Sequence, residues 1–426
     1  MKTTLCAALL AAACAPAAAV DLAWSGFATL GYARSDAPYT YQRSIDRNGT
    51  FARDSVLAGQ LDMRLTPQWS ATVQAKAAPA LNADHRWDLT ASWAFVAWRP
   101  NDDWLLRAGR LRVPLFLYSE TQDVGAANDM ARTPNEMHAI TPTPDFTGLY
   151  ATRNWTLGDR EITVDGYSGF ANMTYRQWSR EGMGTGLAAG ARFTDVRVRS
   201  TGLVLTVREP DALWRAGIHK TNTRRAGNQP MAVRFPRVTL APGIGYWQVD
   251  DALPGPGVDY VPSIENLLFT VGAELQLGNG WRVAGELGRA RQFDTELGAD
   301  ATAGYLALFK SIDRFTPYVS VSRMLSSRSQ REWYDRLSQA TMPSFVPGAA
   351  QIVAAQRAAA DLQTVFDQHS IGIGMSYRLD ASSKLKAEWM RTSIGKTSSM
   401  VDVPPGGASP SGTHVNVISV NYSVAF

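Results

Sequence analysis

Acidic residues gather in one long, unpatterned segment, and basic residues recur in the regularly patterned stretches before it. Within residues 114–146, four acids form a candidate functional set: Glu120, Asp123, Asp129 and Glu136. The stretches before this segment supply five candidate basic partners: Arg64, Lys76, Arg107, Arg110 and Arg112. Acids that face bases across a narrow aqueous space create a transverse field, which sorts solutes by charge without making or breaking bonds. The simpler alternative is an external loop whose acids only solvate it or pair with Arg132.

Side chains that commonly perform covalent chemistry form no recognisable catalytic set. The five histidines are scattered along the chain: His85, His138, His219, His369 and His414. The sequence contains no Gly-x-Ser-x-Gly, no His-Glu-x-x-His, no phosphate-binding glycine loop and no calcium-loop pattern. His219 could be a general base beside Arg215, but a structural position is the simpler interpretation. We therefore predict no catalytic residue, no cofactor and no metal site.

Composition excludes several broad classes. The chain has 426 residues, of which 45% are hydrophobic and 19% charged, so it can bury a core. Beyond the N-terminus the longest apolar run is about six residues, Trp93 to Trp98, whereas a membrane helix needs roughly 20. The net charge of +4 is not concentrated in a basic block, which argues against a nucleic-acid partner. Arg supplies 35 of the 42 basic residues and suits planar contacts with carboxylates and phosphates.

The N-terminus has the three parts of a secretory signal peptide. Lys2 is the charged start, Leu5 to Ala13 the apolar middle, and Ala17 to Ala19 a small-residue cleavage site. We predict that residues 1–19 are removed and that residues 20–426 form a single domain.

Both cysteines, Cys6 and Cys14, lie within this predicted signal. The mature chain would then contain no thiol, which excludes a disulfide scaffold and a cysteine-based metal site. The alternative is a lipoprotein attached through Cys14, because Leu10 to Cys14 loosely resembles a lipobox.

The rest of the chain repeats one pattern, strict alternation of apolar and polar residues. In residues 55–66 one face carries Leu57, Gly59, Leu61, Met63 and Leu65, and the other Gln60, Asp62, Arg64 and Thr66. This period of two predicts β-strands. The sixteen predicted strands are 22–34, 55–66, 69–78, 89–99, 104–113, 147–157, 161–171, 199–208, 213–225, 266–277, 281–293, 301–311, 315–325, 369–379, 384–394 and 413–426.

The connections between these strands alternate, mostly long and then short, along the whole chain. Antiparallel neighbours put all the short turns on one rim and all the long loops on the other, as in transmembrane barrels. The strands of a soluble propeller or tandem sandwich would also alternate apolar and polar residues, but their buried face would be rich in large residues. Here the apolar face often uses Ala and Gly, and charges lie in mid-strand on the polar face. We therefore predict an all-β, closed, sixteen-stranded antiparallel transmembrane barrel.

Three features together resemble the Gram-negative outer-membrane general porin family, the sixteen-stranded trimeric porins. They are the N-terminal segment Trp24 to Tyr32, the long third loop after the fifth strand, and the last strand with Tyr422, Val424 and Phe426. The last strand also resembles the signal read by the barrel-assembly machinery. The resemblance implies a homotrimer in the outer membrane, a third loop folded into the barrel as a constriction, and passive diffusion of small hydrophilic solutes and ions. Outer-membrane lipid and lipopolysaccharide would be further partners.

A weak anion preference follows from the residues that the alternation places inside. Seven inward bases are expected: Arg64, Lys76, Arg107, Arg282, Arg378, Lys384 and Lys386. Five inward acids oppose them: Asp62, Asp165, Glu274, Glu286 and Glu388. Two alternatives stay open, a substrate-specific channel for an anionic solute and an outer-membrane barrel hydrolase.

Two local predictions depart from the regular pattern. In the fifth strand, continued alternation would turn Arg110 and Arg112 toward lipid, so we predict a β-bulge at Gly109 that returns both to the interior. In the seventh long loop, Ala349 to Phe366 is rich in helix-forming residues and predicts a helix of about four turns.

Overall fold

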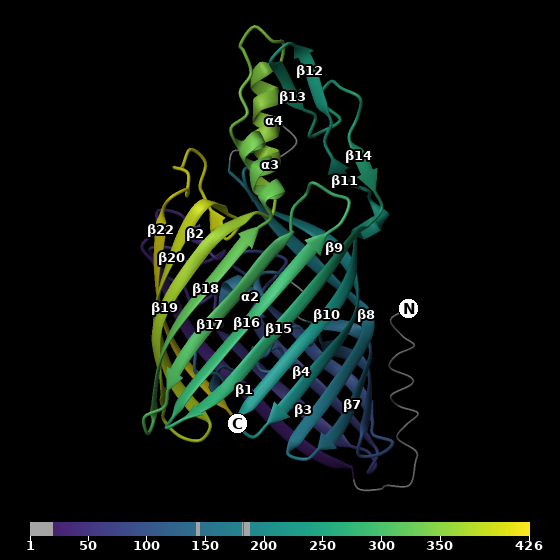
Figure 1. Cartoon of the computed structure of the whole chain (residues 1–426), viewed down its shortest axis with the longest axis vertical. Helices are drawn as coiled ribbons and strands as arrows, with labels where there is room; N and C mark the ends of the chain where they lie inside the picture. The colour runs from purple at the N-terminus through teal and green to yellow at the C-terminus, as the bar shows by residue number, and fades with distance from the viewer. Residues whose placement is uncertain (1–19, 142–144, 181, 183–187) are drawn as a thin grey trace.

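The computed structural model describes residues 20–141, 145–180, 182 and 188–426. The predicted signal peptide, residues 1–19, lies outside the described residues. Sixteen strands form one closed antiparallel barrel, so the predicted fold class is confirmed. Figure 1 shows this barrel from the side. The barrel closes where the first strand pairs with the last, from Phe27 opposite Ala425 to Ser35 opposite Val417.

All sixteen predicted strands are present in the predicted order. In sequence they are β1 Asp21–Ser35, β3 Val56–Arg64, β4 Trp69–Pro79, β5 Trp87–Trp98, β6 Trp104–Arg112, β7 Asp145–Leu157, β8 Arg160–Ser179, β9 Gly190–Glu209, β10 Ala212–Arg225, β15 Ile264–Gly278, β16 Trp281–Gln292, β17 Ala301–Lys310, β18 Phe315–Ser326, β19 Phe366–Arg378, β20 Ser383–Ser398 and β22 His414–Ala425. The largest difference is in β8 and β9, which run well past their predicted ends as one long hairpin.

The two faces of the strands follow the predicted alternation. Predicted outward residues are strongly exposed: Leu57 at 55%, Val73 at 44%, Val271 at 52%, Ile373 at 55% and Val420 at 49%. Leu61 is only half-buried, whereas the predicted inward residue Gln74 is 5% exposed. An exposed apolar belt around a closed barrel is the surface that lipid covers. Among the described residues, no helix is long and apolar enough to cross a membrane.

Two long connections build a separate layer above the barrel rim. Four short strands pair as β11 Met231–Arg234 with β14 Asp259–Val261, and β12 Arg237–Ala241 with β13 Ile244–Trp247. Helices α3 Arg328–Ser338 and α4 Ala349–Asp361 stand beside them in Figure 1. The layer has its own apolar core, which includes Phe235, Trp333 and Leu337. The predicted helix is thus confirmed as α4, although it ends before Phe366.

The predicted β-bulge at Gly109 is wrong. Strand β6 pairs with β5 and with β7 in regular register, and Gly109 lies opposite Phe95 and Gly148. A Cβ atom at Gly109 would collide with the Ala94 carbonyl, so this glycine permits close backbone approach rather than an extra residue. The register shift lies instead between β4 and β5, where Ser92 is the additional residue.

This error has a physical cause. The predicted bulge depended on the assumption that water fills the barrel interior beside Leu111, so that Leu111 would have to face lipid. Instead Leu111 is 2% exposed and packs in a buried cluster with Phe116 and Phe146. Because an apolar side chain is stable there, the regular register costs nothing at Leu111.

The register makes a prediction for the second barrel strand. In single-cysteine variants Leu61→Cys and Asp62→Cys, a water-soluble thiol reagent should label position 62 faster, because Asp62 faces the lumen and Leu61 the lipid. Faster labelling at position 61 would reverse the assigned faces, since a slip of one residue inverts a strand.

Candidate functional site: the lumen and its third loop

We call the connection between β6 and β7, residues 113–144, loop 3; its described part, residues 113–141, lies inside the barrel. Its described part includes η2 Gly125–Ala127 and α2 Asn135–His138. The backbone N–H of Leu117 donates to Glu286 at 2.9 Å, and that of Ala131 donates to the Tyr318 hydroxyl at 2.9 Å. Both wall residues face inward on strands far around the barrel from β6. Loop 3 therefore crosses the interior and bonds to the opposite wall.

Asp123 of loop 3 meets two of the predicted basic wall residues directly. Its carboxylate accepts from Lys76 at 2.7 Å and from Arg112 at 2.8 Å. Arg112 is almost fully buried and also donates to Asp145 at 2.8 Å. These charges were expected to face each other across water, but here they form a compact ion-pair group that fixes the start of loop 3 to the wall.

Asp129 forms a second ion-pair group on the other side of the barrel. It accepts from Arg282 at 2.5 Å and from Lys384 at 2.7 Å. Ser376 adds a hydrogen bond at 3.1 Å. Charge-assisted bonds of this kind are roughly twice as strong as neutral ones, so Asp129 holds the middle of loop 3 against β16 and β20.

Glu136 is fully buried at 0% exposure and serves as a third attachment point. Gln368 donates to its carboxylate at 2.8 Å and Ser322 at 2.9 Å, and Ser370 is a further donor. All three donors lie on β18 and β19. Glu136 is therefore enclosed by the wall and does not face the water-filled space.

Glu120 is the one predicted loop acid that stays exposed. It makes no ion pair or hydrogen bond with any residue in the part of the chain that the structure describes. Its charge acts on the Tyr150 hydroxyl together with those of Arg107 and Arg215. Arg107 lies over the Tyr150 ring at 4.1 Å. Sequence reasoning omitted Arg215 from the pore wall, although it shares the polar face of β10 with His219.

The remaining two predicted wall bases lie elsewhere. Arg64 is exposed at the end of β3, on the rim of short turns, in inward register. Arg110 is exposed, lies opposite Thr147 in the sheet and is among the residues that line the vestibule described below. Its place on the pore wall stays a prediction, whereas Lys76, Arg107 and Arg112 face the interior.

Between loop 3 and the long loops at the rim lies a cavity of about 880 Å³, which we call the vestibule. Its upper side is crossed by the long β8–β9 hairpin. Arg176 of that hairpin joins Asp84 at 3.0 Å and Asp402 at 2.7 Å, and Arg43 joins Asp84 at 2.6 Å. Burial acts to raise the pKa of Asp84, but the hydrogen bonds and charges of Arg176 and Arg43 outweigh it and leave that pKa below its usual range.

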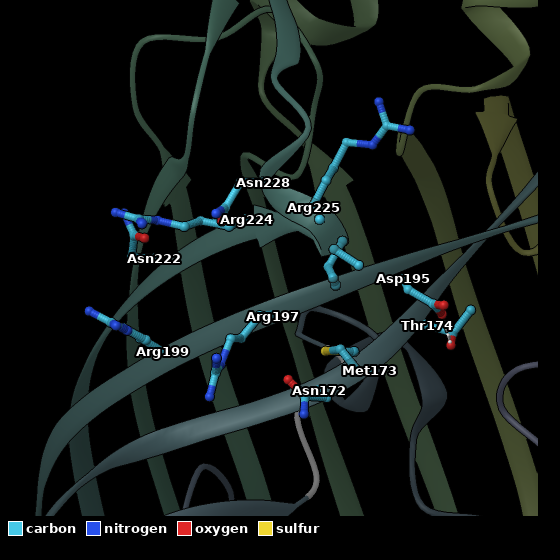
Figure 2. Close-up of a pocket in the computed structure, with 13 residues that line it drawn as sticks. Asn172, Met173, Thr174, Asp195, Arg197, Arg199, Asn222, Arg224, Arg225 and Asn228 are labelled. Carbon is cyan, nitrogen blue, oxygen red and sulfur yellow. Dashed lines mark hydrogen bonds between the residues drawn. The ribbon is translucent and has the colours of Figure 1, made fainter.

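A second, smaller cavity of about 530 Å³ lies on the outward side of β8 to β10 at the loop rim. Figure 2 shows Arg197, Arg199 and Arg224 around it. The Arg197 guanidinium covers the Phe170 ring at 4.2 Å, and Asp195 is the only acid among the lining residues. The composition of this cavity suits a phosphate or carboxylate group.

The remaining candidate residues show no catalytic arrangement. His219 is buried, and its Nδ1 lies 3.0 Å from the Tyr167 hydroxyl. Among the described residues there is no group of three or more His, Cys, Asp or Glu side chains that could hold a metal ion.

The chain end takes part in barrel closure. The backbone N–H of Gly26 donates to the Phe426 carbonyl at 2.7 Å, and the Phe426 N–H donates back to Gly26 at 2.9 Å. Tyr422 faces outward at 42% exposure and Phe426 is 70% exposed; Val424 shares their register. An assembly signal in these residues stays a prediction.

The ion-pair groups predict unequal effects of two neutralising substitutions in loop 3. Asp129→Asn leaves Arg282 and Lys384 without their shared counter-charge, and should cost about 1–3 kcal/mol of barrel stability. Glu120→Gln is the matched control and should leave stability unchanged. Loss of heat-resistant folded barrel on electrophoresis measures both, and equal stability of the two variants would contradict the proposed attachment.

Comparison with known proteins agrees with this architecture. No protein-family model and no curated protein matches the chain. Among solved structures, OmpT, an outer membrane protein of Vibrio cholerae, has a TM-score of 0.53 at 9% identity, covering 96% of this chain and 99% of that one. The outer membrane channel DcaP of Acinetobacter baumannii has a TM-score of 0.51 at 10% identity, with 96% and 99% coverage. An anion-selective porin from Comamonas acidovorans has a TM-score of 0.50 at 12% identity, with 96% and 100% coverage. The chain therefore has the fold of the Gram-negative outer-membrane porins, a closed, sixteen-stranded, multi-pass β-barrel.

Proposed function

We propose that the protein is an outer-membrane porin of a Gram-negative bacterium, a water-filled channel for passive diffusion of small hydrophilic solutes and ions. The supporting observation is a lumen lined by charged side chains of both signs inside a barrel whose outer surface is apolar. Charged residues on an inner wall are stable only beside water or beside counter-charges. Loop 3 narrows this lumen without contributing a chemical step, which supports a non-enzymatic role.

The ion preference that we propose is weak and favours anions. Ion pairs with loop 3 neutralise Lys76, Arg282 and Lys384, so these residues contribute little to selectivity. Arg107, Arg215 and Lys386 are left free of ion pairs among the described residues, and the inward acids Glu120 and Asp165 offset part of their charge. A small excess of positive charge should remain at the narrowest part of the lumen.

We further propose a homotrimer that the barrel-assembly machinery inserts through the terminal strand. One of the solved structures with this fold is described as the trimer form of Vibrio cholerae OmpT, at a TM-score of 0.53 and 10% identity.

Outer-membrane lipid, including lipopolysaccharide, is the partner that we propose for the rim cavity of Figure 2. Arg197 and Arg199 lie on the outward side of β9, above the exposed Leu203 and Leu205 of the same strand. That order, an apolar band and then arginines, matches the order of acyl chains and phosphorylated headgroups in a lipid leaflet.

Two alternatives have less support. An outer-membrane hydrolase would need a nucleophile beside a histidine, yet the buried His219 contacts Tyr167 and no carboxylate among the described residues. A substrate-specific channel for an anionic solute would need a built anion site in the lumen, which is considered below.

A charge-removal experiment tests the channel and its selectivity together. In planar bilayers under a salt gradient, the protein should give discrete conductance steps and a reversal potential on the anion side. Arg107→Gln should move the reversal potential toward cations, whereas the outward-facing control Arg323→Gln should not. Strong cation preference of the unaltered protein would refute the proposed selectivity.

A further inference from the structure

Two arginines from different loops meet in the vestibule. Arg53 belongs to the connection between β1 and β3, residues 36–55, and Arg132 belongs to loop 3. The Arg53 guanidinium donates to the Asn135 side-chain oxygen at 3.0 Å. Arg132 donates twice to Asp54 at 3.1 Å, and its side chain is 7% exposed. Both arginines line the vestibule.

The counter-charge around this pair is incomplete. Asp54 is the one carboxylate within ion-pair distance of either arginine among the described residues, and it contacts only Arg132. Burial lowers the pKa of Arg53, and the charge of Arg132 lowers it further. The two guanidinium groups therefore lie in a poorly solvated place with a single acid beside them, and that acid pairs with only one of them.

The other charged side chains around Arg53 and Arg132 leave the net charge of this part of the vestibule positive. Arg43 and Arg176, also at the vestibule, are paired with Asp84 and Asp402. Lys386 of the wall donates to the Gly125 carbonyl at 2.9 Å and has no acid within ion-pair distance in the described part of the chain. Of the other acids that line the vestibule, Asp88, Asp123 and Asp145 are paired with bases, and Glu388 accepts from the Tyr318 hydroxyl at 2.8 Å.

The pair also has unused donors. Arg53 Nε and Arg132 Nη1 are buried nitrogen atoms with no hydrogen-bond partner among the described residues. A buried charged donor without an acceptor is costly, so a site of this kind favours a ligand that supplies acceptors. Planar guanidinium groups match the oxygen geometry of carboxylates and phosphates.

We propose that Arg53 and Arg132 form a binding site for a small oxyanion, a carboxylate or phosphate group, in the vestibule above loop 3. The inference rests on the proposed channel function and deepens it by naming a solute class. The bound oxyanion accepts from the guanidinium groups of Arg53 and Arg132 that line the vestibule, while Asp54 and Asn135 hold the two side chains in place. A solute that binds there is concentrated at the entrance to the narrow region that loop 3 forms.

Chloride conductance through single channels provides the test. Sodium phosphate or sodium acetate is added to the side of the long loops, and the reduction of chloride current is measured against concentration. The unaltered channel should show saturable block by at least one of these oxyanions. Arg53→Gln should raise the half-blocking concentration roughly tenfold or more, because one charge-assisted bond is lost.

Control variants separate this effect from general damage. Arg323→Gln removes an outward-facing arginine and should leave the block unchanged. Arg53 is preferable to Arg132 as the test position, because it holds no ion pair with a described residue. Equal heat resistance of the two variants on electrophoresis shows that the barrel is intact.

The outcomes distinguish the inference from the proposed function. Conductance without block by either oxyanion, or block that Arg53→Gln does not weaken, would overturn the oxyanion site and leave the channel in place. Absence of conductance steps would overturn the channel instead. Calorimetric titration of the detergent-solubilised protein with phosphate and with acetate would then decide the site: heat that Arg53→Gln abolishes supports it, and no heat in the unaltered protein refutes it.

Discussion

The closed ring of backbone hydrogen bonds is the constraint on which the rest of this structure depends. A strand edge exposed to hydrocarbon would leave N–H and C=O groups unpaired at several kcal/mol each, so the sheet must close on itself. Closure occurs between β1 and β22 and extends to the final residue through Gly26 and Phe426. Once the sheet is closed, each strand has one face toward lipid and one toward the lumen. The alternation in the sequence follows directly from this geometry.

Closure also explains why the interior is rich in ion pairs. Inward-facing bases such as Lys76, Arg282 and Lys384 cannot turn outward into the apolar belt, because a charge at the middle of that belt costs about 2–4 kcal/mol. Loop 3 supplies the acids that these bases need, and Asp123 and Asp129 each contact two of the wall bases. The wall and the loop therefore hold each other in place. Only residues outside these groups, such as Arg107, Arg215 and Glu120, are left to act on passing solutes.

The parts of the structure that could be predicted are those with local causes. In each strand, apolar and polar residues alternate because successive side chains point to opposite faces of the sheet. This alternation is a local property of the sequence, and it predicted all sixteen strands. Contacts between loop 3 and the wall depend on the path of an unpatterned segment, which no local rule determines. For that reason Asp123 was predicted to face bases but not to touch them, and the burial of Glu136 was missed. Helix α3 had a usable local signal, because the Ser327 side chain accepts from the Gln330 backbone as an N-cap.

The excess of arginine over lysine now has a structural explanation with three parts. Inside the barrel, Arg112 and Arg282 each bond to two acids at once, which a planar guanidinium does better than an ammonium group. At the loop rim, the Arg197 guanidinium group covers the Phe170 ring, and Arg197 also lines the cavity of Figure 2. In the vestibule, Arg53 and Arg132 stay charged although the one acid beside them pairs only with Arg132, because guanidinium rarely loses its proton. A lysine pair in that position could become neutral, so only arginine keeps a lasting positive charge above loop 3.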